Sequence, residues 1–112
     1  MRWGLSEKTI AEVREFLAMC PEIEKAIVYG SRAKGRFRDG SDVDLTLIGE
    51  TVTPKTLYKL SELLEDSYLP YRFDISILKF LDNPMLLEHI ERVGQVFYAR
   101  EAIAHESIAV AD

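Results

Sequence analysis

Hydrophobic and polar positions along this chain follow two periods, and each period predicts its own kind of element. Apolar side chains recur at helical spacing in some stretches, while others are short apolar runs or alternate between apolar and polar residues. We expect helices at residues 7–19, 54–65 and 84–94, and strands at 25–29, 42–48, 71–78 and 95–98. This order predicts an α/β (α+β) fold, a small mixed sheet with helices mainly on one face.

The length of 112 residues suits a single domain, because domains typically span about 50–200 residues. We expect the core of this domain at about residues 23–98, followed by a tail at 99–112 without a strong hydrophobic period. The chain contains no internal repeat and no low-complexity stretch. A separate substrate-binding domain would not fit into this length.

Composition and charge narrow the classes of partner. The chain has 14 basic and 19 acidic residues and a net charge of −5, so direct binding of nucleic acid is not expected. Its one cysteine, Cys20, excludes an internal disulfide and indicates a reducing, cytoplasmic location. No apolar run approaches the about 18–20 residues of a membrane span, and the N-terminus does not resemble a signal peptide.

Carboxylates lie on the polar face of two expected strands. Asp42 and Asp44 are two positions apart, so their side chains share one face, and Asp74 has the corresponding place in the 71–78 strand. Taken singly, each of them is more typical of a solvated or salt-bridged surface charge. Together they would repel one another unless a cation lay between them, and oxygen ligands suit Mg²⁺. The combination therefore favours a metal site.

A glycine and a serine follow the 25–29 strand. Backbone N–H groups at Gly30 and Ser31 and the Ser31 hydroxyl can bind a phosphate, although an ordinary strand-to-helix turn has the same pattern. Four basic residues follow within seven positions: Arg32, Lys34, Arg36 and Arg38. A basic stretch of this kind is usually a solubilising loop, but its place between the turn and the carboxylates favours a triphosphate site.

Other polar and aromatic residues fall outside this pattern. His89 and His105 are too few and too distant in sequence to indicate a zinc site or a general base, and we expect both to be ordinary surface or helix residues. Trp3 and the tyrosines are expected to serve the core or contacts.

The combined motif resembles that of the DNA polymerase β-like nucleotidyltransferase superfamily. The resemblance rests on the segments Gly30-Ser31-Arg32-Ala33-Lys34-Gly35 and Ser41-Asp42-Val43-Asp44-Leu45, followed by Asp74. Within the superfamily the chain is most similar to the minimal nucleotidyltransferases (MNT), antitoxins encoded beside HEPN-domain proteins. The likeness covers about residues 23–98, and Lys34 stands where many members have arginine.

This resemblance implies roles for individual residues. Asp42 and Asp44 would bind two Mg²⁺ ions and the triphosphate of ATP, and Asp74 would bind the second ion and help to activate the attacking hydroxyl. Gly30 and Ser31 would hold the β- and γ-phosphates. The implied nucleotide-binding residues are Gly30, Ser31, Arg32, Lys34 and Ser41.

The resemblance also implies an activity and a partner. The chain would transfer AMP from ATP to a hydroxyl, expected to be a tyrosine of a cognate HEPN toxin, and would thereby act as an antitoxin in a hetero-oligomer. One alternative is a module that binds nucleotide and partner without catalysis. The other is a small-molecule nucleotidyltransferase that needs a second subunit.

Overall fold

Four strands form one mixed sheet in the computed structural model, which describes residues 1–38 and 40–100. The strands are β1 (Lys25–Tyr29), β2 (Val43–Ile48), β3 (Phe73–Ile77) and β4 (Gln95–Ala99). Their order across the sheet is β3-β2-β1-β4. Strand β1 is antiparallel to both of its neighbours, whereas β2 and β3 are parallel. The predicted mixed sheet is confirmed.

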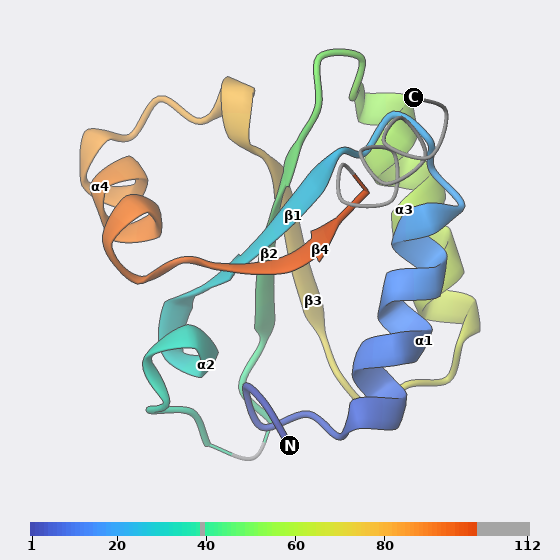
Figure 1. Cartoon of the computed structure of the whole chain (residues 1–112), viewed down its shortest axis with the longest axis vertical. Coiled ribbons are helices and arrows are strands. Elements are labelled where there is room, and N and C mark those ends of the chain that lie inside the picture. Colours follow the sequence, from blue (N-terminus) through green and yellow to red (C-terminus); the bar gives the residue numbers. More distant parts are fainter. Residues whose placement is uncertain (39, 101–112) are drawn as a thin grey trace, which may run out of the picture.

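Helices lie on both sides of this sheet, the two longest on one side. The helices are α1 (Glu7–Ala18), α2 (Gly30–Lys34), α3 (Pro54–Asp66) and α4 (Pro84–Val93), with a short 3₁₀ turn, η1 (Leu78–Phe80). Figure 1 shows α1 and α3 together on one side of the sheet, and α2 and α4 on the other. The mixed α/β class is therefore confirmed, but only the two longest helices share one face, whereas the expectation placed the helices mainly on one face.

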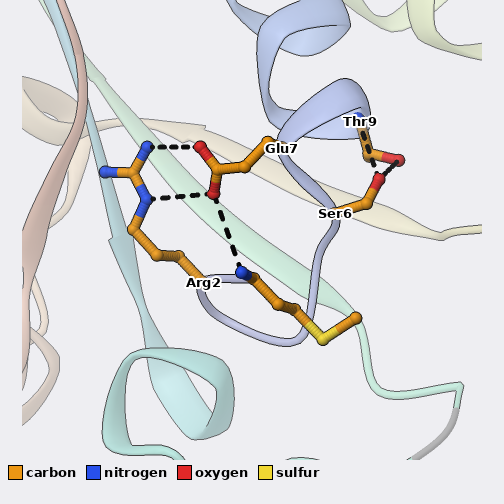
Figure 2. A network of polar contacts seen from close by, with 5 residues as sticks. Arg2, Ser6, Glu7 and Thr9 are labelled. Carbon is orange, nitrogen blue, oxygen red and sulfur yellow. Dashed lines mark hydrogen bonds and ion pairs between the residues drawn. The ribbon is translucent and has the colours of Figure 1, made fainter.

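Polar side chains fix the points at which the helices begin. The Ser6 side chain caps α1 by accepting a hydrogen bond from the Thr9 N–H over 3.1 Å, as Figure 2 shows. The same view shows an ion pair between Arg2, which precedes α1, and Glu7, which lies in the first turn of α1. Asn83 caps α4 in the same manner as Ser6 caps α1. These caps explain why the predicted helix starts are confirmed.

The two faces of the sheet differ in polarity. Val43, Leu45 and Leu47 of β2 are fully buried in the core that α1 and α3 cover. The alternate residues of the strand point the other way, and there Asp44 lies opposite Asp74 of β3. The period-two pattern of β2 therefore separates the hydrophobic core from a polar surface.

Some boundaries differ from those expected. β2 begins at Val43, so Asp42 lies just before the strand and is exposed. β3 is shorter than the predicted 71–78 segment, because the chain turns into η1 after Ile77. Most of the predicted tail, from residue 101 on, lies outside the described residues. In the described part of the chain, no helix is long and apolar enough to cross a membrane.

Candidate functional site

The starts of two neighbouring strands, β2 and β3, bring the predicted carboxylates to one edge of the sheet. Asp44 pairs in register with Tyr29 of β1 on one side and with Asp74 of β3 on the other. Asp42 precedes β2 by one residue and is exposed, as is Asp74, whereas Asp44 is half-buried. The parallel pairing of β2 and β3 thus places two carboxylates on directly opposed positions.

Asp44 is the residue on which the electrostatics of this edge converge. Burial raises the pKa of its carboxyl to about 6, and the charges of Asp74 and then Asp42 add to the rise. Arg32 acts in the opposite sense. The same causes raise the pKa of the Tyr29 hydroxyl, where burial leads and the charges of Asp44 and Asp74 contribute. A cation at this edge would relieve the repulsion among the carboxylates.

The donor chemistry of the edge suits a hard divalent cation, but the ligands are not drawn together into a finished cluster. Three carboxylates offer the oxygen ligands that Mg²⁺ prefers, with the remaining positions open to water or phosphate. In residues 1–38 and 40–100, no group of three or more His, Cys, Asp or Glu side chains is close enough to hold a metal ion by itself.

Gly30 connects the carboxylates to the predicted phosphate turn. Its φ is 77°, a left-handed conformation that favours glycine, and a Cβ at this position would overlap the Asp44 carboxylate. The residue therefore lets the backbone of the turn pass directly over Asp44. This close approach brings the first backbone N–H of α2 and a carboxylate into the same small volume.

The basic stretch after the turn divides into a buried and an exposed part. Arg32 is 4% exposed, whereas Lys34, Arg36 and Arg38 are exposed. Gly35, with a φ of 75°, closes α2 after Lys34. Lys34 is the last residue of α2, and Arg36 and Arg38 lie on the loop that leads from α2 toward β2, where exposed cations can approach an anionic ligand.

Arg32 and Ser41 bind one another. The Arg32 guanidinium donates to the Ser41 carbonyl oxygen through Nε and Nη2 over 3.1 and 2.8 Å, and to the Trp3 carbonyl oxygen over 2.9 Å. Its Cζ also lies 5.3 Å from the Phe37 ring centroid. The Ser41 hydroxyl accepts from the Arg38 N–H. Both residues therefore hold the loop in shape, and their contact with a nucleotide stays a prediction.

A second set of contacts supports α2 from the N-terminal residues. The Trp3 indole N–H donates to Oε1 of Gln95 over 3.0 Å, and the Gln95 amide donates to the Ala33 carbonyl oxygen over 3.1 Å. Trp3 also packs on Phe97, with ring centroids 5.1 Å apart. We call Trp3, Arg32, Ala33 and Gln95 the α2 brace. Together these residues join the N-terminal segment and the start of β4 to α2.

His89 belongs to the site, although the sequence was interpreted otherwise. The Gly30 N–H donates to its Nε2 over 3.2 Å, and its ring meets Tyr29 edge-on. The prediction of an ordinary surface or helix residue overlooked this place because His89 lies 59 positions after Gly30 in the sequence. Neither spacing nor composition could have indicated that contact.

Known proteins share this fold. The family model described as polymerase beta, nucleotidyltransferase, matches residues 11–103. A chain from a toxin–antitoxin complex crystallised with AMP-PNP is 18% identical, with a TM-score of 0.66, over 91% of this chain and 86% of its own. Among curated proteins, none matches this chain.

Two further solved structures have the same fold. One is a chain from the structure of the tri-AMPylated Shewanella oneidensis HEPN toxin in complex with MNT antitoxin, with 13% identity and a TM-score of 0.63 over 96% of this chain and 87% of that chain. The other is a variant of the MntA–HpeT toxin–antitoxin, with 19% identity and a TM-score of 0.62 over 96% and 86%. The family model spans most of the chain, and with the carboxylate edge and the glycine turn in place we conclude that this chain belongs to the polymerase beta nucleotidyltransferase family.

Proposed function

We propose that this nucleotidyltransferase transfers AMP from ATP to a tyrosine hydroxyl of a HEPN partner and so acts as its antitoxin. The observation that carries the proposal is the opposed pair Asp44 and Asp74 beside the Gly30 turn. A carboxylate pair next to a backbone phosphate turn combines the two parts that nucleotidyl transfer requires, a cation site and a triphosphate site.

Asp42, Asp44 and Asp74 would hold magnesium. The raised pKa of Asp44 supports this role, because its carboxylate lies among like charges that a divalent cation would neutralise. When bound, two such ions would neutralise charge on the triphosphate and on the attacking and leaving oxygens. The chain's own contribution would be to hold the three carboxylates at one sheet edge, with Asp44 and Asp74 in register.

Gly30, Ser31 and Lys34 would hold the β- and γ-phosphates of ATP. Gly30 and Ser31 present the backbone at the start of α2, and the exposed Lys34 supplies a positive charge at its end. Arg32 and Ser41 would act on the nucleotide through the shape of the loop that they hold. Charged phosphate oxygens form stronger hydrogen bonds to backbone N–H groups than neutral acceptors do.

The proposed reaction is an in-line displacement at the α-phosphorus of ATP. The acceptor hydroxyl oxygen forms a bond to this phosphorus, and the bond to the bridging oxygen breaks, so that pyrophosphate leaves with its electron pair. The hydroxyl proton passes to Asp74, which lies exposed at the sheet edge where an acceptor can approach. AMP remains on the acceptor as a phosphodiester.

A helical partner of the HEPN class is proposed as the acceptor. The similar structures include an MNT antitoxin bound to a HEPN toxin that carries three AMP groups, and another was crystallised with AMP-PNP. A cytoplasmic location is also proposed, since Cys20 is a free, buried thiol.

Co-expression with the product of the adjacent reading frame tests this function. Intact mass spectrometry should show the partner heavier by whole AMP units with the wild type and unchanged with Asp44→Asn or Asp42→Asn, while Asp66→Asn, at the end of α3, is the matched control and should behave as wild type. Purified components should lose transfer when divalent metal is chelated.

The outcomes separate the alternatives. A partner that stays unmodified but co-purifies with the wild type would favour a non-catalytic antitoxin. If the partner is not modified and does not bind this chain, the result would favour a small-molecule acceptor. Unchanged transfer by Asp44→Asn would refute the role given to the carboxylates.

A further inference from the structure

His89 holds a backbone donor at the centre of the site. The Gly30 N–H donates to Nε2 of His89 over 3.2 Å. The half-buried imidazole also meets the Tyr29 ring at an interplanar angle of 79°, with centroids 6.2 Å apart. Two contacts from β1 and α2 therefore position this ring over the turn that carries Gly30.

This hydrogen bond defines the state of the imidazole. Nε2 accepts a hydrogen bond from the Gly30 N–H, so in this arrangement Nε2 carries no proton of its own. A phosphate oxygen bound at Gly30 would need the same N–H, and it would face the lone pair of Nε2. That pairing is repulsive unless Nε2 becomes a donor, which a histidine achieves by moving its proton from Nδ1 to Nε2 through exchange with solvent.

We propose that His89 is a further nucleotide-contacting residue of this enzyme: its imidazole releases the Gly30 N–H to a phosphate oxygen of ATP and then donates its Nε2–H to that oxygen. The proposal rests on the proposed function, because it needs the triphosphate at Gly30. With only 3.2 Å between the two nitrogens, an oxygen can accept from both only after the ring has shifted. The half-buried position of the ring allows such a shift.

The contact can be measured through the binding of AMP-PNP with Mg²⁺ by isothermal titration calorimetry. His89→Phe keeps an aromatic ring against Tyr29 but removes both nitrogens, so affinity should fall by about tenfold, the usual effect of losing one hydrogen bond to a charged group. His89→Gln can both accept and donate, and it should restore most of the affinity. Glu91→Gln, an exposed change on the same helix, is the matched control and should bind as the wild type does.

The result also distinguishes this proposal from the function on which it rests. If wild type binds and Asp44→Asn weakens binding, but His89→Phe binds equally or more tightly, the role of His89 is wrong and the proposed function stands. If wild type does not bind AMP-PNP, both are overturned. Circular dichroism verifies folding, and His89→Leu replaces His89→Phe if the larger ring disrupts α4.

Discussion

At the scale of single residues, Gly30 shows how closely backbone and carboxylate approach in this site. Two constraints act on it, a positive φ of 77° and the Asp44 carboxylate in the space where a side chain would begin. Gly35, at the other end of α2, has a φ of 75°, but a Cβ added there would meet nothing within 4 Å. A comparison of substitutions at the two glycines therefore distinguishes the cost of backbone strain from the cost of steric overlap.

Gly30→Ala should lower the free energy of unfolding by about 3 kcal/mol, whereas Gly35→Ala should cost about 1 kcal/mol, because the second change meets backbone strain alone. Urea denaturation of both variants provides the comparison. In an Asp44→Ala background the overlap disappears, so Gly30→Ala should there cost no more than Gly35→Ala. Equal costs of the two glycine changes in the wild-type background would contradict this interpretation.

Residues whose place in the fold depends on neighbouring sequence could be predicted, and residues whose place depends on distant partners could not. Gly30 and Asp44 stand at a strand end and on a polar strand face, which their immediate neighbours define. The burial of Arg32 depends on Trp3 and Ser41, and the place of His89 depends on the approach of α4. Arg32 is therefore buried, although it belongs to a basic stretch of sequence that is typical of an exposed loop.

At the scale of elements, the α2 brace couples residues near the N-terminus to the Gly30 turn. Trp3 contributes twice, through its carbonyl oxygen to Arg32 and through its indole N–H to Gln95, which in turn binds Ala33. Since α2 has five residues, its position depends on these tertiary contacts more than on its own helical propensity. The brace is thus expected to set the rigidity of the turn.

Trp3→Phe keeps an aromatic ring near Phe97 but removes the indole donor to Gln95. We expect it to destabilise the protein by about 1 kcal/mol and to speed amide hydrogen exchange at Gly35 and Arg36, whose N–H groups bond to carbonyls of α2.

Glu7→Gln serves as the control, because it removes an exposed ion pair to Arg2 and leaves the brace intact. Its exchange at Gly35 and Arg36 should equal that of the wild type. If Trp3→Phe shows the same exchange as Glu7→Gln, the brace does not support α2.

Element types were predictable because their signals are short-range, while their ends were less so. The Ser6 and Asn83 caps and the alternation in β2 lie within a few residues of the elements that they define. The early end of β3 at Ile77 is different, since it follows from the turn of η1 beside the sheet. Tertiary packing determines where a strand such as β3 ends, and the local sequence gives little indication of that position.

At the scale of the whole molecule, the carboxylate edge shapes how stability depends on pH. A pKa of about 6 at Asp44 lies above the ordinary value of 3.8, so the folded state binds a proton that the unfolded state releases. For this group, stability therefore rises as the pH falls through about 6 toward 4. The lowered pKa values of Glu7 and Glu22 act in the opposite direction.

A comparison with Asp44→Asn isolates this contribution. In metal-free buffer at about pH 7 the variant should be more stable by about 1 kcal/mol, a value discounted for the half-exposed position of the carboxyl. The difference should shrink as the pH is lowered to about 4, because the folded wild type then binds the proton that neutralises Asp44, while the unfolded chain stays largely ionised at this group. Urea unfolding across this range provides the measurement, and a variant that is less stable than the wild type at pH 7 would contradict it.

Sheet order was the part of the architecture that the sequence left open. Periodicity indicates which residues of β1, β2, β3 and β4 face the core, but it contains no information on which strands are neighbours. The order β3-β2-β1-β4 arises because β1 pairs with β2 on one edge and with β4 on the other. The site depends on this order, which opposes Asp44 and Asp74.

The pairing of β1 with β4 has a consequence for synthesis of the chain on the ribosome. Residues 25–29 emerge early, but their second partner, residues 95–99, emerges much later. Gln95 and His89, which contact Ala33 and Gly30, also arrive late. A nascent chain would therefore already expose its aspartates while the turn beside them still lacked support. The proposed nucleotide site would be complete only after β4 has emerged from the ribosome.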